Sequence, residues 1–147
     1  MITISPTKNS PNEGRKAVQV ILDANFLLAP GEVGVDIFEE MENTIDKKYD
    51  LIMPEPVKVE IQNLSGGNGE EAKAAKIALM LMERNDVEVL GTDKKTGDAS
   101  IVELVREVET PVVATNDKNL RNQFRERSIP TLYVRTGDHV ELEGDIK

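Results

Sequence analysis

The chain has 147 residues, no cysteine, a single histidine and a net charge of −9, with 27 acidic residues against 18 basic ones. This length is typical of one domain that buries a core without disulfide bonds. Thiolate metal sites are excluded, and any metal ion must be held by oxygen ligands, because His139 is the only histidine. The acidic charge argues against nonspecific coating of nucleic acid, although a local basic strip can still steer a phosphate backbone.

The first residues are polar. Residues 1–16 contain Pro, Asn, Ser and Gly, which predicts a flexible extension before a domain at 17–147. They include no apolar run of the signal-peptide type, and no segment approaches the ~20 apolar residues of a membrane helix. We therefore expect a cytoplasmic protein without membrane association.

The first half of the chain alternates between strand and helix patterns. The run AVQVIL at 17–22 is apolar and rich in β-branched residues, which indicates a buried strand, and YDLIMP at 49–54 is similar. Between them, 35–45 carries apolar residues at helical spacing. The segment 70–85 predicts a helix, because its acids come first and a basic residue lies near its end, as the helix dipole favours. The glycines of SGGNG at 65–69 indicate a flexible connection.

The second half continues the alternation. Short apolar runs predict strands at 87–90, 111–115 and 131–134. The segment 98–109 predicts a helix with Asp98 as a plausible N-cap. The sequence YVRTGDHVEL predicts a C-terminal hairpin that carries His139 on its surface. This order of elements predicts an α/β fold: a mostly parallel central sheet of about five strands, with helices on both faces.

Two acids follow predicted strands. Asp23 comes directly after the strand at 17–22, and Asp117 lies two residues beyond the strand at 111–115. Ligands of an open parallel sheet bind beyond the carboxyl ends of its strands, so we expect both acids at one edge. Helix capping or an Asx-turn explains either acid alone, whereas the pair favours a shared site.

Three neutral polar residues accompany these acids, namely Asn25, Thr115 and Asn116. Their amides and hydroxyl can orient a carboxylate or a metal-bound water from a second layer of contacts. Ordinary turn chemistry explains each of them equally well when taken singly.

Two segments carry a family resemblance. ILDANFLL at 21–28 and VVATNDKNL at 112–120 resemble the PIN-domain ribonucleases, and the order of elements is similar over roughly residues 17–135. The resemblance implies a PIN-like three-layer fold and a site of four acids, which map onto Asp23, Glu60, Asp98 and Asp117. Two alternatives compete for these positions: Glu55 precedes Glu60 on the presumed helix, and Asp93 precedes Asp98 in a loop.

Closely spaced carboxylates either take up protons or share a cation, since their charges repel. Oxygen ligands favour one or two Mg²⁺ or Mn²⁺ ions. Together with the resemblance, this chemistry implies an endoribonuclease that hydrolyses RNA phosphodiesters with a metal-activated water. A catalytically inactive PIN-fold module that binds RNA or protein is the alternative.

A basic, amphipathic helix is predicted behind Asp117. Lys118, Arg121 and Arg125 are three and four residues apart, so they share one face and are candidates for RNA binding beside the acids. A solvated helix face explains the same spacing. Lys94 and Lys95, on the loop before Asp98, are weaker candidates for the same role.

Phosphotransfer proteins of the haloacid-dehalogenase or receiver type also place an Asp after the first strand. The haloacid-dehalogenase type requires a second acid at the position where this chain has Asn25. The receiver type requires an acid after the third strand, where this chain has the sequence VLGT. As partners we expect an RNA substrate and a second copy in a homodimer, with an antitoxin or a ribosome-assembly protein as a further possibility. The resemblance admits a toxin of a toxin–antitoxin pair or an rRNA-processing enzyme. The run from VVATNDKNL to RERSIPTLYVR is more similar to the archaeal and eukaryotic rRNA-processing branch.

Overall fold

Six strands form a single sheet in the computed structural model, which describes residues 17–146. The extension predicted at 1–16 lies outside the described residues. The strands are β1 (Val18–Leu22), β2 (Tyr49–Pro54), β3 (Glu88–Leu90), β4 (Pro111–Ala114), β5 (Thr131–Arg135) and β6 (His139–Glu143), in the spatial order β3-β2-β1-β4-β5-β6. The first five run parallel, and β6 pairs antiparallel with β5. The predicted mostly parallel sheet is therefore confirmed, with the C-terminal hairpin adding its sixth strand.

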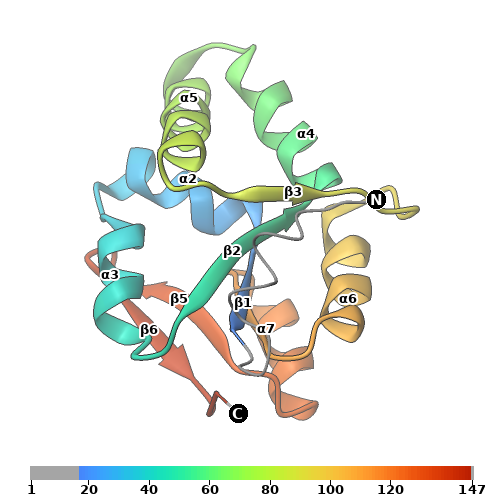
Figure 1. Cartoon of the computed structure of the whole chain (residues 1–147). Coiled ribbons are helices and arrows are strands. Elements are labelled where there is room, and N and C mark those ends of the chain that lie inside the picture. Colours follow the sequence, from blue (N-terminus) through green and yellow to red (C-terminus); the bar gives the residue numbers. More distant parts are fainter. Residues whose placement is uncertain (1–16, 147) are drawn as a thin grey trace.

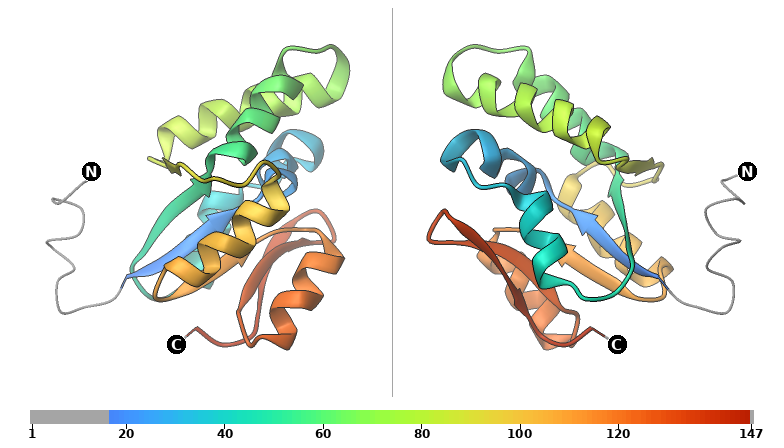
Figure 2. Two further views of the ribbon diagram at one scale, coloured as in Figure 1. Left: turned by 90° about the vertical axis from the view of Figure 1, so that its right-hand side faces the viewer. Right: turned by 60° about the vertical axis from the view of Figure 1, so that its left-hand side comes forward.

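The part of the chain at 17–146 also forms six helices: α2 (Ala24–Val33), α3 (Ile37–Thr44), α4 (Glu55–Ser65), α5 (Gly69–Arg84), α6 (Gly97–Glu107) and α7 (Lys118–Glu126). Figures 1 and 2 show α3 on one face of the sheet and α6 and α7 on the other, which confirms the expected helix–sheet–helix layers. The α4–α5 pair projects beyond one end of the sheet as an antiparallel hairpin (Figure 2). No helix within 17–146 is both long and apolar enough to cross a membrane.

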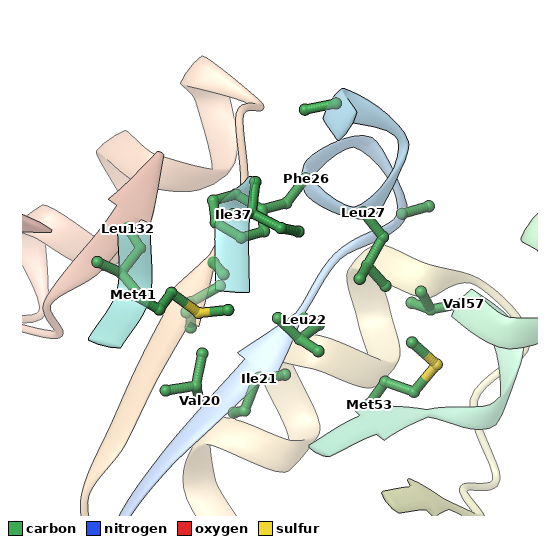
Figure 3. Packing of buried hydrophobic residues seen from close by; sticks show 14 of the residues in the cluster. Val20, Ile21, Leu22, Phe26, Leu27, Ile37, Met41, Met53, Val57 and Leu132 are labelled. Atoms are coloured by element: carbon green, nitrogen blue, oxygen red, sulfur yellow. The ribbon is translucent and has the colours of Figure 1, made fainter. Parts of the chain in front are cut away.

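Strand β1 runs through the centre of the core. All its residues except Gln19 are buried, because β2 and β4 flank it and helices lie on both faces. Figure 3 shows side chains of β1 and β2 gathered with those of α2, α3 and α4, among them Leu22, Met53, Phe26 and Val57. A strand buried on both faces needs a continuous apolar sequence rather than an alternating one, which explains why the run at 17–22 is recognisable.

Helix α2 crosses α5 at a very short distance. A Cβ added to Gly31 of α2 would lie 2.5 Å from the Cα of Ala74 and 2.8 Å from its Cβ, so only glycine permits this approach. The helix ends at Gly34, whose left-handed backbone (φ 80°) suits glycine and whose N–H donates to the Pro30 carbonyl. This crossing holds the α4–α5 hairpin, and with it one of the predicted acids, against the segment that follows β1.

Candidate active site

The carboxyl ends of β1 and β4 lie side by side. Leu22 and Ala114, the last residues of these strands, are paired in the sheet, and the N–H of Asp23 donates to the Ala114 carbonyl at 3.0 Å. Asp23 and the segment that leads to Asp117 therefore leave the sheet at the same edge, as the sequence predicts.

One hydroxyl connects these two acids. Asp23 is 6% exposed, and its Oδ2 accepts a hydrogen bond from the buried Thr115 hydroxyl at 2.7 Å. The same hydroxyl oxygen accepts the N–H of Asp117 at 3.1 Å. The other oxygen of Asp23, Oδ1, accepts the N–H of Ala24 at 2.8 Å and caps α2. Asp23 thus has a single orientation, fixed from both strand ends.

The two asparagines brace the same edge. Asn25 accepts the backbone N–H of Asn116 at 2.9 Å through Oδ1, and the Asn116 amide donates to the Asn25 carbonyl at 3.2 Å. The side-chain oxygen of Asn116 accepts the Val134 N–H at 2.8 Å. Both side chains join the start of α2 to the ends of β4 and β5, which are the backbone segments next to Asp23 and Asp117.

Asp117 caps α7, because its Oδ1 accepts the N–H of Leu120 at 3.0 Å. The structural and the functional interpretations of this residue are compatible. The other carboxylate oxygen, Oδ2, takes no part in this cap. The cap also places the carboxylate at the positive end of the helix dipole.

The other two acids come from α4 and α6. The N-cap of α6 is Thr96, whose hydroxyl accepts the Ala99 N–H at 3.2 Å, so the prediction that Asp98 caps this helix is wrong. Asp98 lies in the first turn instead, and its carboxylate is not used for capping. Glu60 of α4 lies against the same turn, since its Oε1 is 3.7 Å from the position of a Cβ at Gly97.

Electrostatics link all four acids. The pKa of Asp23 is raised, chiefly by burial, against the lowering effect of the hydrogen bonds from Thr115 and Ala24; the negative charges of Asp98 and Asp117 raise it further. The pKa of Glu60 is raised by partial burial, and then by Asp23 and Asp98. Neither competing acid, Glu55 or Asp93, is among these causes. Four acidic side chains from separate segments of the chain therefore form one electrostatically interacting group.

The site fits a hydrated cation better than a closed cage of ligands. Within 17–146, no three Asp, Glu or His side chains form a ready-made ligand set around one point. Mg²⁺ is usually held by one or two carboxylates and retains several waters, so it does not need such a set. The oxygen donors and the accumulated negative charge at Asp23 and Glu60 suit this mode of binding.

The structure divides the three basic residues of α7 into Lys118 and a pair of arginines, Arg121 and Arg125, that both contact Glu143. Lys118 is exposed at the first position of the helix, next to Asp117. Arg121 stacks on Tyr133, with its guanidinium 4.0 Å from the ring centroid. Arg125 binds Glu143 with two nitrogens, at 2.7 and 2.9 Å, and Glu143 pairs with the first residue of β5, towards the opposite edge of the sheet. Of the three, Lys118 is the one that follows Asp117 directly and has an exposed side chain at the start of α7.

The residues that hold these arginines carry no local sequence signal. Tyr133 lies on β5 and Glu143 lies on β6. Both contact α7 because the β5–β6 hairpin packs along this helix. Gly97, between the cap of α6 and Asp98, was missed for another reason. Gly97 matters because its missing side chain leaves space beside Glu60, and Glu60 lies 37 residues earlier in the sequence.

Comparisons with known proteins agree on a family. Residues 20–137 match the model of the PIN like domain. The chain is 26% identical over 129 residues to Ribonuclease VapC4 of Methanocaldococcus jannaschii, covering 86% of this chain and 97% of that protein. It is 34% identical over 88 residues to Ribonuclease VapC9 of Archaeoglobus fulgidus, covering 59% of this chain and 62% of that protein.

Solved structures give the same result. The PIN domain endonuclease Utp24 superposes with a TM-score of 0.72 at 30% identity, over 88% of this chain and 93% of that one. A domain of a functionally unknown protein from Methanocaldococcus jannaschii shares the fold, with a TM-score of 0.57 at 18% identity, over 82% of this chain and 93% of that one. The chain belongs to the PIN-like domain family.

Proposed function

We propose that this protein is an endoribonuclease that depends on Mg²⁺ or Mn²⁺ and hydrolyses RNA phosphodiesters at the carboxyl edge of its sheet. One observation carries the proposal: Asp23, Glu60, Asp98 and Asp117 come from four segments, and acids of this group raise the pKa of Asp23 and Glu60 further, in addition to burial, which is the main cause of the shift. The names of the similar proteins, two ribonucleases and one endonuclease, support it.

The four acids would hold one or two divalent ions. When bound, such an ion supplies Lewis-acid chemistry, which makes an attacking water more acidic and offsets charge on the phosphate. The protein supplies orientation. Thr115 and the N–H of Ala24 fix both oxygens of Asp23, and the α7 cap fixes one oxygen of Asp117. Asp23 is therefore held before the substrate arrives, which reduces the entropy lost on forming the reactive arrangement.

Glu60 is suited to handle protons. Its pKa is raised, chiefly by partial burial and then by Asp23 and Asp98, which makes it a stronger proton acceptor than an ordinary carboxylate. It is also more exposed than Asp23, so the attacking water can reach it. In the hydrolysis, the water oxygen forms a bond to phosphorus while the bond from phosphorus to one ribose oxygen breaks. The leaving oxygen takes up a proton, and two RNA fragments result.

RNA binding is proposed to begin at Lys118, whose ammonium group follows Asp117 directly on the exposed start of α7. Arg121 and Arg125 remain candidates for phosphate contacts, and Arg125 would have to exchange Glu143 for a phosphate. The homodimer and the antitoxin or ribosome-assembly partner also remain proposals, as do the toxin and rRNA-processing roles. The similarity to two ribonucleases named VapC is compatible with the toxin role.

The direct test is cleavage of labelled single-stranded and structured RNA in Mn²⁺, in Mg²⁺ and in EDTA. We expect cutting only with a divalent ion, and a loss of about 100-fold or more for Asp23→Asn and Asp117→Asn, since each removes a charge that holds the ion. Asp93→Asn is the matched control, because Asp93 is an exposed loop acid that does not act on Asp23 or Glu60.

Cutting that persists in EDTA, or that Asp23→Asn leaves unchanged, would contradict the proposal. RNA binding without cleavage in any metal would favour the binding module instead.

A further inference from the structure

An open groove lies beside the acidic site, between α4 and the start of α6. Its volume is about 420 Å³, and its lining includes Pro56, Val59 and Leu64 on α4 and Lys95 and Gly97 on the opposite side. Glu60 lines it too, so the groove and the acidic site share a wall. We call it the α4 groove. Figure 2, in its left-hand view, shows the start of α6 next to the first turns of α4.

The α4 side of this groove is apolar and accessible. Val59 is 44% exposed, and only Val33 and Met80 are comparable large hydrophobic residues within the described part of the chain. It stands one residue before Glu60, so an apolar contact surface adjoins a proposed catalytic carboxylate. Val59 does not stand alone, because Pro56 and Leu64 line the groove with it, and a contiguous apolar surface, unlike a single exposed side chain, indicates a contact site.

Gly97 keeps the groove open towards the acids. A Cβ at this position would approach the Cγ2 of Val57 to 3.3 Å and the Oε1 of Glu60 to 3.7 Å. Its φ is not in the left-handed region, so the space, and not the backbone conformation, explains the glycine. Any larger residue would narrow the passage between the loop at 95–97 and Glu60.

Charge along the groove changes in a definite order. Lys95, preceded by the exposed Lys94, supplies positive charge at one side of a protein whose net charge is −9. Glu60 follows, with Asp98 and Asp23 in its electrostatic range. An apolar wall, a cation and an acidic centre match the parts of a nucleotide chain: a base, a flanking phosphate and the phosphate held for hydrolysis.

We propose that the α4 groove is a base subsite, which receives one unstacked nucleobase of single-stranded RNA next to the phosphodiester at the acids. This inference rests on the proposed nuclease function and specifies its substrate: a nucleotide within a duplex cannot place its base there. Val59 and Leu64 contact the base face, Lys95 binds the flanking phosphate, and the Asn63 amide, which also lines the groove, offers a donor and an acceptor to the base edge.

Binding in the absence of cleavage tests this subsite. Asp117→Asn protein in EDTA is titrated with short single-stranded RNAs of fixed sequence, and the dissociation constant is compared after adding Val59→Gln or Met80→Gln. Met80 is the matched control, being 46% exposed on α5 and outside the groove. We expect Val59→Gln to weaken binding about tenfold, the value of one buried aliphatic side chain, and Met80→Gln to leave it unchanged.

A second arm identifies the occupant. RNAs with an abasic nucleotide at each position in turn should reveal one position where the loss of the base weakens binding, and Val59→Gln should cost nothing further there. Equal effects of Val59→Gln and Met80→Gln, or additive effects of Val59→Gln and every abasic position, would overturn the base subsite and leave the groove to an apolar side chain of a protein partner. Thermal melting of each variant shows that it is folded.

The two proposals fail differently. If wild-type protein cuts RNA and Val59→Gln changes neither binding nor the cleavage positions, the subsite is wrong and the nuclease stands. If binding depends on Val59 and the base but no metal supports cleavage, the nuclease is wrong and the protein is a single-strand-binding module.

Discussion

At the level of single residues, Thr115 has the most sharply defined role, because its hydroxyl donates to Asp23 and accepts from the backbone of Asp117. Replacing it by valine keeps the shape and removes both bonds. The hydrogen bond from Thr115 lowers the pKa of Asp23, so Thr115→Val should raise that pKa further. Carbon-13 NMR titration of the Asp23 carboxyl measures this shift without any substrate.

The same variant should lose about 1–3 kcal/mol of unfolding free energy at neutral pH, as expected when buried polar groups lose a partner. Thr115→Ser, which retains the hydroxyl, should restore the pKa of Asp23 and most of the stability. An unchanged pKa in Thr115→Val would show that burial alone determines the titration of Asp23.

Individual residues also show what the sequence can predict about the site. Asp23 and Asp117 were identifiable because each follows a buried strand. In a parallel sheet the carboxyl ends of neighbouring strands lie at the same edge, so both acids are expected there. The cap of α6 was not, since Thr96 and Asp98 are both good N-cap residues and lie two positions apart. The Arg125–Glu143 ion pair could not be predicted from the sequence, because it depends on a hairpin that folds back along α7.

At the level of elements, α7 carries two kinds of basic residue. Lys118 is proposed to bind phosphate, whereas Arg125 joins α7 to β6 through Glu143. Lys118→Gln should therefore weaken RNA binding and lower its dependence on salt by about one unit of slope, with little change in stability. Arg125→Gln should reduce the unfolding free energy by up to about 1 kcal/mol, a small effect because the arginine is mostly exposed, and leave RNA binding nearly unchanged.

Fluorescence anisotropy at several salt concentrations and urea unfolding of both variants separate the two roles. If Arg125→Gln proves as damaging to RNA binding as Lys118→Gln, then α7 presents a continuous phosphate-binding face and Glu143 is displaced by RNA.

The crossing of α2 and α5 gives a second prediction at this level. Gly31→Ala places a methyl group 2.5 Å from the Ala74 Cα, so the helices must separate, and the unfolding free energy should fall by about 1–3 kcal/mol despite the better helix propensity of alanine. Gly66→Ala is the matched control. Its backbone is right-handed and its nearest contact is 3.6 Å, so the change should stay within about 1 kcal/mol.

Urea unfolding compares the two. A neutral Gly31→Ala would mean that α5 shifts at no cost, and that the position of Glu60 on the adjoining α4 is less firmly fixed than the packing indicates. Activity measurements on the folded variant would then report that displacement directly.

Helix α2 also illustrates where sequence reasoning failed among the elements. The sequence pattern predicts no helix at 24–33, and Pro30 and Gly31 disfavour one. The helix forms nevertheless, because Asp23 caps its start, Phe26 and Leu27 enter the core, and α5 packs against its glycine. Tertiary packing outweighs local propensity here, and only the fold shows it.

For the whole molecule, the sheet and its layers were predictable, because five apolar runs separated by helical patterns admit few topologies. The clustering of Glu60 and Asp98 with the strand-end acids was not derivable from spacing. It depends on how the α4–α5 hairpin and α6 pack around the edge of the sheet, and it entered only through the family resemblance.

The burial of Asp23 at this edge, close to other acids, has a consequence for stability. Without a cation, the raised pKa of Asp23 means that the folded protein binds protons more readily than the unfolded chain. The stability linked to this uptake is complete below the ordinary carboxyl pKa, about 4, and is lost as the pH rises through the raised value. Ionised Asp23 therefore destabilises the metal-free protein at neutral pH.

Asp23→Asn removes this charge while keeping a good N-cap for α2. In EDTA at neutral pH the variant should melt at a higher temperature than the wild type, and the difference should shrink as the pH is lowered towards about 4. Adding Mn²⁺ should reverse the order, because an ion that binds only the folded wild type raises its melting temperature. Asp93→Asn should follow the wild type in both conditions, since that loop acid does not act on Asp23. A variant that melts below the wild type in EDTA at every pH, or that gains as much from Mn²⁺, would show that Asp23 is a purely structural cap.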